Sequence, residues 1–238
     1  MIRKLLSGLL AGLLTVSLCA CGGDDTRGED SQREAQVSET DRNGEQAQEQ
    51  EMQEQGEAGN PKILIAYFTW AENAVPDENV DATASPSVTE PGHVGQLARW
   101  VQEETGGDLF SIRVTEPYSS DWDECLDRAN GENRDNIHPE LEEVLESTAD
   151  YDTVFIGYPN WWYSCPMAIF SFIDEHDLAG KDIYLFCSHG TGGLAGSVED
   201  ISAALPDSNV SDNVFDVYEE DAPSAREELL DWLSGIRF

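Results

Sequence analysis

The stretch GYPNWWYSCP, at 157–166, concentrates the residue types best suited to hold a ligand. It places two adjacent tryptophans, Trp161 and Trp162, and the thiol of Cys165 between two apolar runs. Flat aromatic faces bind flat amphipathic molecules well, because each ring gives a large contact area with a preferred geometry. We therefore expect a binding site at this loop.

Other kinds of site chemistry have less support. A serine hydrolase would need a nucleophile elbow, G-x-S-x-G, and the sequence contains none. Ser188 and His189 are neighbours in the chain, which does not make them a catalytic pair. The four histidines show no metal-ligand spacing, so we expect no metal site and assign no catalytic residue.

From residue 61 onward, apolar runs rich in β-type residues alternate with segments of helical periodicity. The runs are 62–68, 108–114, 151–158, 181–187 and 213–219, of which the last is the weakest. The helical patterns are 93–107, 166–176, 193–206 and 222–235, with one or two further helical segments within 121–147. Such alternation is typical of a parallel sheet with right-handed crossovers. We predict an α/β domain with a doubly wound five-stranded parallel sheet and helices on both faces.

In such a sheet, ligands bind beyond the carboxyl ends of the strands, where the strand order reverses. The loops that follow the first, third and fourth strands carry the unusual residues. They are TWAEN…PGHV, PNWWYSCP and SHGTGGLAG. The loop after the fourth strand also contains GTGGLA, which matches the dinucleotide-binding fingerprint. In a dinucleotide-binding fold that fingerprint lies in the first crossover, and the first crossover of this sequence has no comparable glycine pattern.

Taken together, these segments resemble the flavodoxin family over 62–238, and within it the flavodoxin-like proteins found among bacterial lipoproteins. ILIAYFTW resembles the first strand and phosphate loop, and DWDECLDRAN resembles the second helix. GYPNWWYSCPMAIFSF and FCSHGTGGLAGSVEDI resemble the two isoalloxazine loops. The resemblance implies non-covalent FMN and one- or two-electron transfer, in which the flavin carries the chemistry.

The resemblance also implies a set of FMN-binding residues. A phosphate would lie at a helix N-terminus, where main-chain N–H groups and the helix dipole favour an anion. The expected phosphate residues are Thr69, Trp70, Ala71, Gly92, His93 and Val94. The expected ring residues are Pro159, Asn160, Trp161, Trp162, Tyr163, Ser188, His189, Gly190 and Gly193. We expect Trp161 to lie against the ring and Trp162 to pack beside it, because adjacent residues of an extended segment point in opposite directions.

Two features depart from the family pattern. The phosphate loop is interrupted by residues 73–90, a length that suggests a lid or a docking element. The family's phosphate-binding threonine is replaced by Val94, and Glu72 brings a negative charge nearby. Phosphate binding should therefore depend more on the main chain, and a flavodoxin-like protein without a cofactor stays an alternative.

Two further residue types have open roles near the expected flavin. Cys165 and Cys187 are either core thiols or a redox pair. His189 would stabilise the anionic reduced flavin if it lies near the pyrimidine side of the ring.

The start of the chain has the pattern of an export signal. Residues 1–20 combine a basic start with an apolar run, and LCAC resembles the lipobox of bacterial lipoproteins, which would make Cys21 the lipidated residue. Ordinary secretion with cleavage nearby is the alternative. Residues 21–60 are rich in Glu, Gln, Asp and Gly and without aromatic residues, as expected for a solvated acidic tether to a domain at 61–238.

The formal net charge of −35 limits the partners. It disfavours nucleic acid and adsorption to anionic lipid, so a membrane link would depend on the lipid anchor. A redox partner should present a basic face, unless the acceptor is a small molecule such as a quinone. We expect an FMN-binding electron carrier at the outer face of the membrane, with an FMN-dependent NAD(P)H:quinone-type oxidoreductase and a cofactor-free binding protein as alternatives.

Overall fold

The structure is a computed structural model that describes residues 62–75 and 85–237. The expected signal peptide at 1–20, the lipidation site Cys21 and the acidic tether at 21–60 therefore lie outside the described residues. So do residues 76–84, in the middle of the interruption of the phosphate loop.

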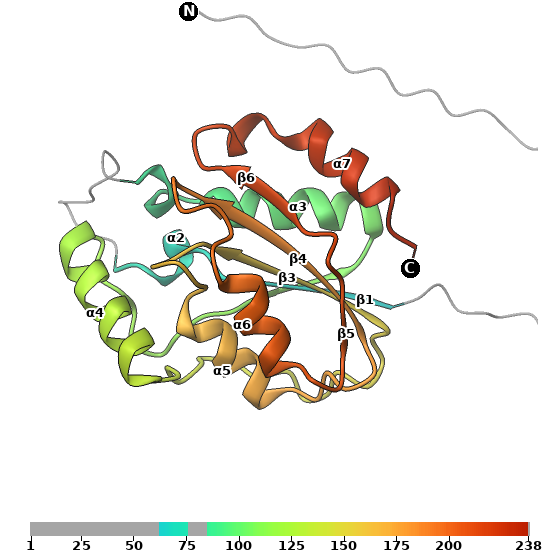
Figure 1. The fold of residues 1–238 in the computed structure, drawn as a ribbon, viewed down its shortest axis with the longest axis horizontal. Coiled ribbons are helices and arrows are strands. Elements are labelled where there is room, and N and C mark those ends of the chain that lie inside the picture. The colour runs from blue at the N-terminus through green and yellow to red at the C-terminus, as the bar shows by residue number, and fades with distance from the viewer. Residues whose placement is uncertain (1–61, 76–84, 238) are drawn as a thin grey trace, which may run out of the picture. The chain divides into compact units, whose positions relative to one another are not determined.

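A parallel sheet forms the centre of the fold (Figure 1). Its strands are β1 (Ile63–Tyr67), β2 (Asp108–Ser111), β3 (Thr153–Pro159), β4 (Asp182–His189), β5 (Asn209–Val210) and β6 (Phe215–Tyr218). The strand order is β2-β1-β3-β4-β5, and β6 also pairs with β4. The order reverses beside β1, which confirms the predicted doubly wound sheet and puts its switch point between β1 and β3.

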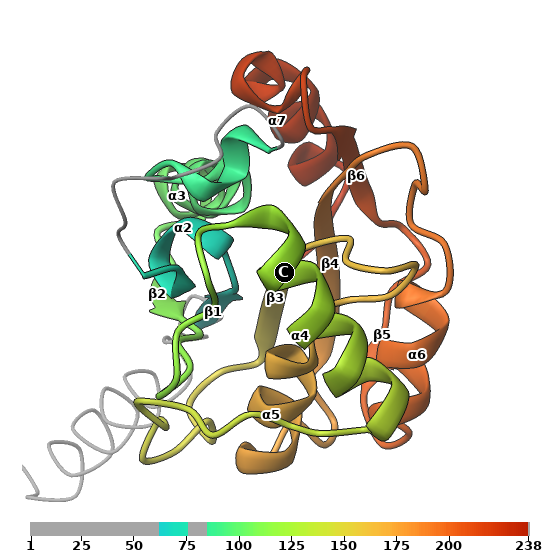
Figure 2. The ribbon, with the colours of Figure 1, turned by 90° about the vertical axis from the view of Figure 1, so that its left-hand side faces the viewer.

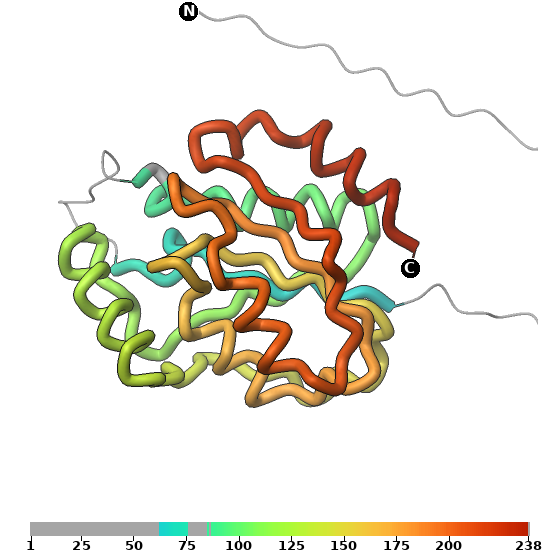
Figure 3. The backbone as a smooth tube through the Cα atoms, in the orientation of Figure 1, coloured from blue at the N-terminus to red at the C-terminus, as the bar shows by residue number. Residues whose placement is uncertain are grey.

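Helices connect the strands. They are α2 (Trp70–Asn73), α3 (His93–Thr105), α4 (Trp122–Asp135), α5 (Met167–Glu175), α6 (Ser197–Ala204) and α7 (Arg226–Ser234), with short 3₁₀ helices η1 (Pro86–Val88) and η2 (Ala222–Ser224). Figure 3 shows how the chain returns through a helix between successive strands from β1 to β5. Within residues 62–75 and 85–237, no helix is both long and apolar enough to cross a bilayer.

The sequence predicts one strand, at 213–219, as the fifth strand of the sheet, but two short strands occupy that place beside β4. β5 pairs with the start of β4, and β6 pairs with its end, so the described sheet has six strands. Between them the chain leaves the ladder, where the Asn213 carbonyl accepts a hydrogen bond from Trp232 Nε1 at 3.2 Å. A side chain of α7 thus takes up a main-chain acceptor at the break.

Helices cover both faces of the sheet, with α3 and α7 on one side and α4, α5 and α6 on the other (Figure 2). In β1, alternate side chains pack against the helices on opposite faces of the sheet. Ile63 and Ile65 pack in one core cluster with Leu97 of α3 and Leu229 of α7. The intervening residues Leu64 and Ala66 belong to the second cluster, on the opposite face. Burial on both faces explains why β1 is apolar at every position.

One helix, α4, forms in the region between β2 and β3. The Asp121 side chain caps it by accepting a hydrogen bond from the Glu124 N–H at 3.0 Å, and Asn136 ends it in the left-handed conformation. Residues 136–152 are all described and form no second helix. Side-chain contacts fix this segment instead: Leu145 N–H donates to His176 Nε2 at 3.0 Å, and Ser171 Oγ donates to the Pro139 carbonyl at 2.6 Å.

Candidate functional site

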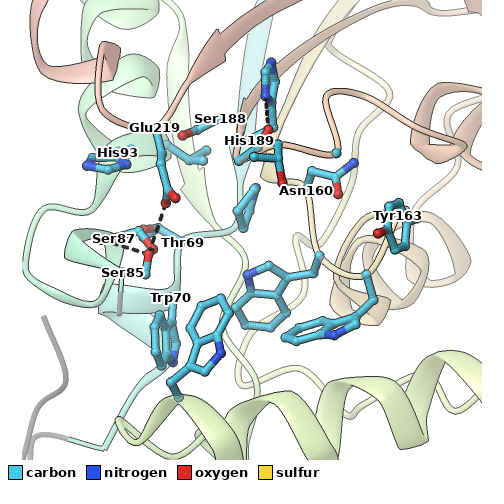
Figure 4. Close-up of a pocket in the computed structure, with 18 residues that line it drawn as sticks. Thr69, Trp70, Ser85, Ser87, His93, Asn160, Tyr163, Ser188, His189 and Glu219 are labelled. Carbon is cyan, nitrogen blue, oxygen red and sulfur yellow. Dashed lines mark hydrogen bonds between the residues drawn. The ribbon is translucent and has the colours of Figure 1, made fainter. Parts of the chain in front are cut away.

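A cavity of about 270 Å³ opens at the carboxyl ends of β1, β3, β4 and β6 (Figure 4). Its lining residues are Thr69, Trp70, Ser85, Ser87, His93, Val94, Trp122, Pro159, Asn160, Trp161, Trp162, Tyr163, Ser188, His189, Gly190, Thr191, Gly192 and Glu219. The cavity includes the switch point of the sheet, where a doubly wound fold binds its ligand.

Polar side chains gather at one end of the cavity, which we call the polar end: the hydroxyls of Thr69, Ser85 and Ser87, the imidazole of His93 and the carboxylate of Glu219. Thr69 directly precedes α2, but its side chain makes no capping hydrogen bond there. Ser85 and Ser87 flank the start of η1, and their Oγ atoms are 2.7 Å apart. Ser85 Oγ also donates to Glu219 Oε2 at 3.3 Å.

The N-terminus of α3 lies at the polar end. The helix begins at His93, and its N-cap residue, Gly92, has no side chain to cap the first N–H groups. His93 is 8% exposed, and its Nδ1 has no hydrogen-bond partner within the described residues. Burial lowers the pKa of His93 from its ordinary value of 6.5, and the charge of Glu219 opposes that shift only in part. An unpartnered buried nitrogen beside free N–H groups is a ready contact for a ligand.

Gly92 makes this arrangement possible. Its φ of 68° is left-handed, a conformation that glycine adopts at little cost. A Cβ at this position would lie 2.0 Å from Thr69 Oγ1. Any other residue would therefore displace the Thr69 hydroxyl.

Aromatic rings form the other end of the cavity, which we call the aromatic end: Trp70, Trp122, Trp161, Trp162 and Tyr163. Trp161 is 7% exposed and packs edge to face on Tyr118, with ring centroids 5.2 Å apart. Trp162 lies tilted beside Trp122, with centroids 6.1 Å apart. The placement of Trp161 against a bound ring stays a prediction.

Trp161 and Trp162 both line the cavity because the chain turns sharply there. Trp161 and Ser164 exchange two main-chain hydrogen bonds, at 3.0 and 3.1 Å. The two residues between them are left-handed, with φ values of 51° for Trp162 and 64° for Tyr163. The expectation of an extended segment was wrong. Glycine or asparagine is usual in such a turn, and strain in bulky side chains is typical of functional sites.

His189 is held by neighbours on both sides of its ring. Nε2 lies 2.9 Å from Asp216 Oδ2, and Nδ1 lies 2.8 Å from the Gly190 carbonyl oxygen. Because both nitrogens face oxygen acceptors, His189 is fixed in place at the edge of the cavity. Its expected effect on a reduced flavin stays a prediction.

The thiols of Cys165 and Cys187 are buried and free. Burial raises the pKa of both, and nearby carboxylates raise it further, so both stay protonated at neutral pH. Thiol–disulfide chemistry requires the thiolate. Of the two roles left open by the sequence, the structure favours that of core thiols.

The structure brings most of the predicted site residues together at this cavity. Ala71, Gly92 and Gly193 are the exceptions that do not line it. Six residues line it without having been named as site residues: Ser85, Ser87, Trp122, Thr191, Gly192 and Glu219, of which Thr191 and Gly192 belong to the predicted loop SHGTGGLAG. For the serines and Glu219 the signal was positional: the two serines lie near the end of the interruption at 73–90, and Glu219 is the last residue of the predicted fifth run at 213–219.

The charge at the polar end comes from a different residue than expected. Glu72 does not line the cavity, since its carboxylate accepts hydrogen bonds from Tyr67 and Ser111 and lies 3.8 Å from Arg99. The carboxylate in the cavity is that of Glu219. Likewise, Val94 lines the cavity without a hydroxyl, but Ser85 and Ser87 supply hydroxyls that the sequence pattern lacked.

The cavity fits a long ligand with an anionic end and a flat ring. Hydroxyls, free helix N–H groups and the orphaned His93 Nδ1 suit the anion, and the aromatic end suits the ring. Among the described residues that line the cavity, Glu219 alone carries a negative charge that opposes an anion. In the described residues, no three potential metal ligands come together.

The sequence of residues 84–236 matches the flavodoxin family. The chain belongs to the flavodoxin family. Its order of strands and helices and the position of its cavity agree with that membership. The sequence has no match among curated proteins.

Solved structures share this flavodoxin-like flavoprotein fold. A candidate flavoprotein from Bacteroides eggerthii is 28% identical, with a TM-score of 0.57 over 74% of this chain and 98% of that one. A second, from Bacteroides uniformis, is 25% identical, with a TM-score of 0.57 over 74% and 99% of the two chains. A flavoprotein from Lactobacillus acidophilus, solved in complex with FMN, is 19% identical, with a TM-score of 0.50 over 73% and 99%.

Proposed function

We propose that this chain is an FMN-binding, flavodoxin-like electron-transfer protein that works at the outer face of a bacterial membrane. The observation that carries the proposal is the cavity at the switch point, with hydroxyls and a helix N-terminus at one end and aromatic rings at the other. The Lactobacillus acidophilus flavoprotein, which shares the fold, was solved with FMN.

The residues of the cavity would divide the work of holding FMN. Thr69, Ser87 and the first N–H groups of α3 would bind the phosphate, and His93 Nδ1 would gain a partner there. The aromatic end would cover the isoalloxazine and exclude water from its faces. The bound flavin supplies one- or two-electron transfer.

Electron transfer to a partner is supported by the edge of the cavity and by the charge of the chain. Tyr163 lines the cavity yet is 72% exposed, so it offers an aromatic contact at the surface beside the proposed ring site. The formal net charge of −35 favours a partner with a basic face. A small acceptor such as a quinone would reach the same edge.

The membrane location is proposed from the sequence. The basic start, the apolar run and the LCAC motif support an exported lipoprotein anchored through Cys21. The acidic composition of residues 21–60 supports a tether, and the same charge disfavours nucleic acid as a partner.

Anaerobic electron transfer from the purified full-length protein tests the proposed function. The protein is loaded with FMN, reduced with dithionite, and mixed with cytochrome c as a basic acceptor or with a water-soluble quinone. We expect the bound flavin to be reoxidised by at least one of them, and the rate with cytochrome c to fall as salt is added. A loaded protein that reoxidises with neither acceptor would contradict electron transfer. Repeated turnover of NADH or NADPH with the quinone as the electron acceptor, without transfer to cytochrome c, would replace the carrier with a reductase.

A further inference from the structure

Glu219 places a carboxylate inside the polar end of the cavity (Figure 4). The sheet fixes its position, because the Glu219 N–H donates to the His189 carbonyl at 2.8 Å and so continues the pairing of β6 with β4. Its side chain reaches the serine pair Ser85 and Ser87, within the interruption of the phosphate loop, where Oε2 accepts a hydrogen bond from the Ser85 hydroxyl at 3.3 Å.

This contact commits the hydroxyl protons of both serines. A serine hydroxyl has one proton to donate. Since Ser85 donates to Glu219, the 2.7 Å contact between the two Oγ atoms must use the Ser87 proton. The hydrogen bonds therefore form a chain, in which Ser87 donates to Ser85 and Ser85 donates to the Glu219 carboxylate. A phosphate at the polar end would have to compete with Glu219 for these donors.

No cation offsets the charge of Glu219 among the described residues. The cavity lining contains no lysine or arginine, and Glu219 belongs to no ion pair of the described chain. His93 lies close enough for its pKa to respond to the charge of Glu219, but burial lowers that pKa below 6.5, so His93 is largely neutral at pH 7. His189 faces the carboxylate of Asp216 instead. An anionic ligand would thus meet an uncompensated negative charge.

We propose that Glu219 is a specificity-determining residue that competes with the ligand's phosphate for the polar end and so weakens FMN relative to riboflavin. The inference rests on the proposed flavin site and deepens it. The two flavins share the ring and the ribityl chain, and they differ only in the phosphate. The ratio of their affinities therefore measures the contribution of the polar end, because contacts of the ring with the aromatic end are the same for both flavins.

The test measures the dissociation constants of FMN and riboflavin by quenching of flavin fluorescence, with the full-length wild type and the Glu219→Gln variant. Glutamine keeps an acceptor for Ser85 but removes the charge. We expect FMN to bind the variant roughly tenfold more tightly or better, by the loss of a like charge at close range, and riboflavin to change less than about twofold. The matched control is Glu220→Gln, which removes the same charge from the exposed neighbouring residue.

Several outcomes decide the inference. An unchanged FMN-to-riboflavin ratio in Glu219→Gln, or weaker FMN binding, would overturn it while leaving the flavin site intact. An equal gain in Glu220→Gln would overturn it too, since bulk charge would then explain the effect. Binding of neither flavin to the wild type would overturn the proposed function itself.

A measurement on the wild type alone tests the same competition if the Glu219→Gln variant fails to fold. Salt screens the repulsion between Glu219 and a phosphate but does not act on uncharged riboflavin in this way. We expect added salt to tighten FMN relative to riboflavin. A ratio that stays constant or falls with salt would contradict the competition.

Discussion

At the scale of single residues, the turn at 161–164 gives a bulky side chain a conformation suited to glycine. Tyr163 has a φ of 64° and is 72% exposed, so it has strain without deep packing to offset it. We expect Tyr163→Gly to raise the free energy of unfolding by up to about 1 kcal/mol, because the left-handed conformation costs about that much for other residues. Denaturant unfolding measures the change.

Tyr218→Gly is the control for that prediction. Tyr218 is also exposed, at 36%, but lies in strand β6, where glycine is unfavourable. Its substitution should lower the free energy of unfolding. If both variants lose stability equally, the turn at Tyr163 is not strained.

The sequence could not reveal this turn. A two-residue turn of this kind is normally recognised from Asn-Gly or a similar pair, and here the central residues are Trp162 and Tyr163. The strain is maintained by the surroundings, since the Tyr163 carbonyl accepts a hydrogen bond from the Gly196 N–H at 3.0 Å. That contact joins loops distant in the sequence, so no local pattern announces it.

At the scale of elements, each end of α3 carries a glycine with a positive φ. Gly92, before the helix, has a φ of 68°, and Gly106, after it, has a φ of 70°. A Cβ on Gly106 would have no atom within 4 Å, whereas one on Gly92 would collide with Thr69 Oγ1. The two positions share a positive φ but differ in ψ, which is 157° at Gly92 and 13° at Gly106, and they also differ in crowding.

Gly92→Ala should therefore destabilise the protein more than Gly106→Ala. We expect about 1 kcal/mol for Gly106→Ala from the left-handed conformation alone, and about 2–4 kcal/mol for Gly92→Ala. Thermal and denaturant unfolding compare them. Equal losses would show that neither the contact with Thr69 nor the ψ of Gly92 adds to the cost of a side chain at this position.

His176 joins α5 to the irregular segment at 136–152 and makes that contact sensitive to acid. Its Nε2 accepts the Leu145 N–H, and its Nδ1 lies 2.7 Å from the Phe172 carbonyl, so the ring must be neutral. Burial lowers its pKa from 6.5. The unfolded chain then binds more protons as the pH falls through 6.5, and the contribution of His176 to stability is lost on acidification.

The pH dependence of a variant isolates this effect from the other charges of the chain. The free energy of unfolding of the wild type should exceed that of His176→Gln by about 1 kcal/mol at pH 7.5, the value of a hydrogen bond, and by less at pH 5. His138→Gln removes another histidine from the same region and serves as the control. A wild-type advantage that is constant or grows toward pH 5 would contradict the neutral ring.

The alternation of apolar runs and helical patterns was enough to predict the doubly wound sheet and three of the loops at its ligand edge. It missed the split of the fifth strand, because a tryptophan from α7 binds the Asn213 carbonyl, and that contact is nonlocal. Glu219 was missed for a related reason. It follows that strand, and only the tertiary fold shows that its carboxylate reaches Ser85.

At the scale of the whole molecule, the proposed membrane anchor depends on one cysteine. Cys21→Ala should shift the full-length protein from the membrane fraction to the soluble fraction in a bacterial host, because a lipid cannot be attached without the thiol. Labelling with a clickable fatty acid measures the attachment directly. A variant that stays in the membrane fraction, or a wild type that takes up no label, would remove the lipoprotein from the proposal.

The central claim is that the cavity binds FMN with its ring at the aromatic end, and a titration of the full-length protein with FMN tests it most directly. We predict quenching of the flavin fluorescence by the neighbouring tryptophans, saturation at one FMN per chain, and loss of most of the affinity in Gly92→Ala but not in Gly106→Ala. A wild-type protein that leaves FMN fluorescence unchanged and stays colourless after dialysis would contradict the claim.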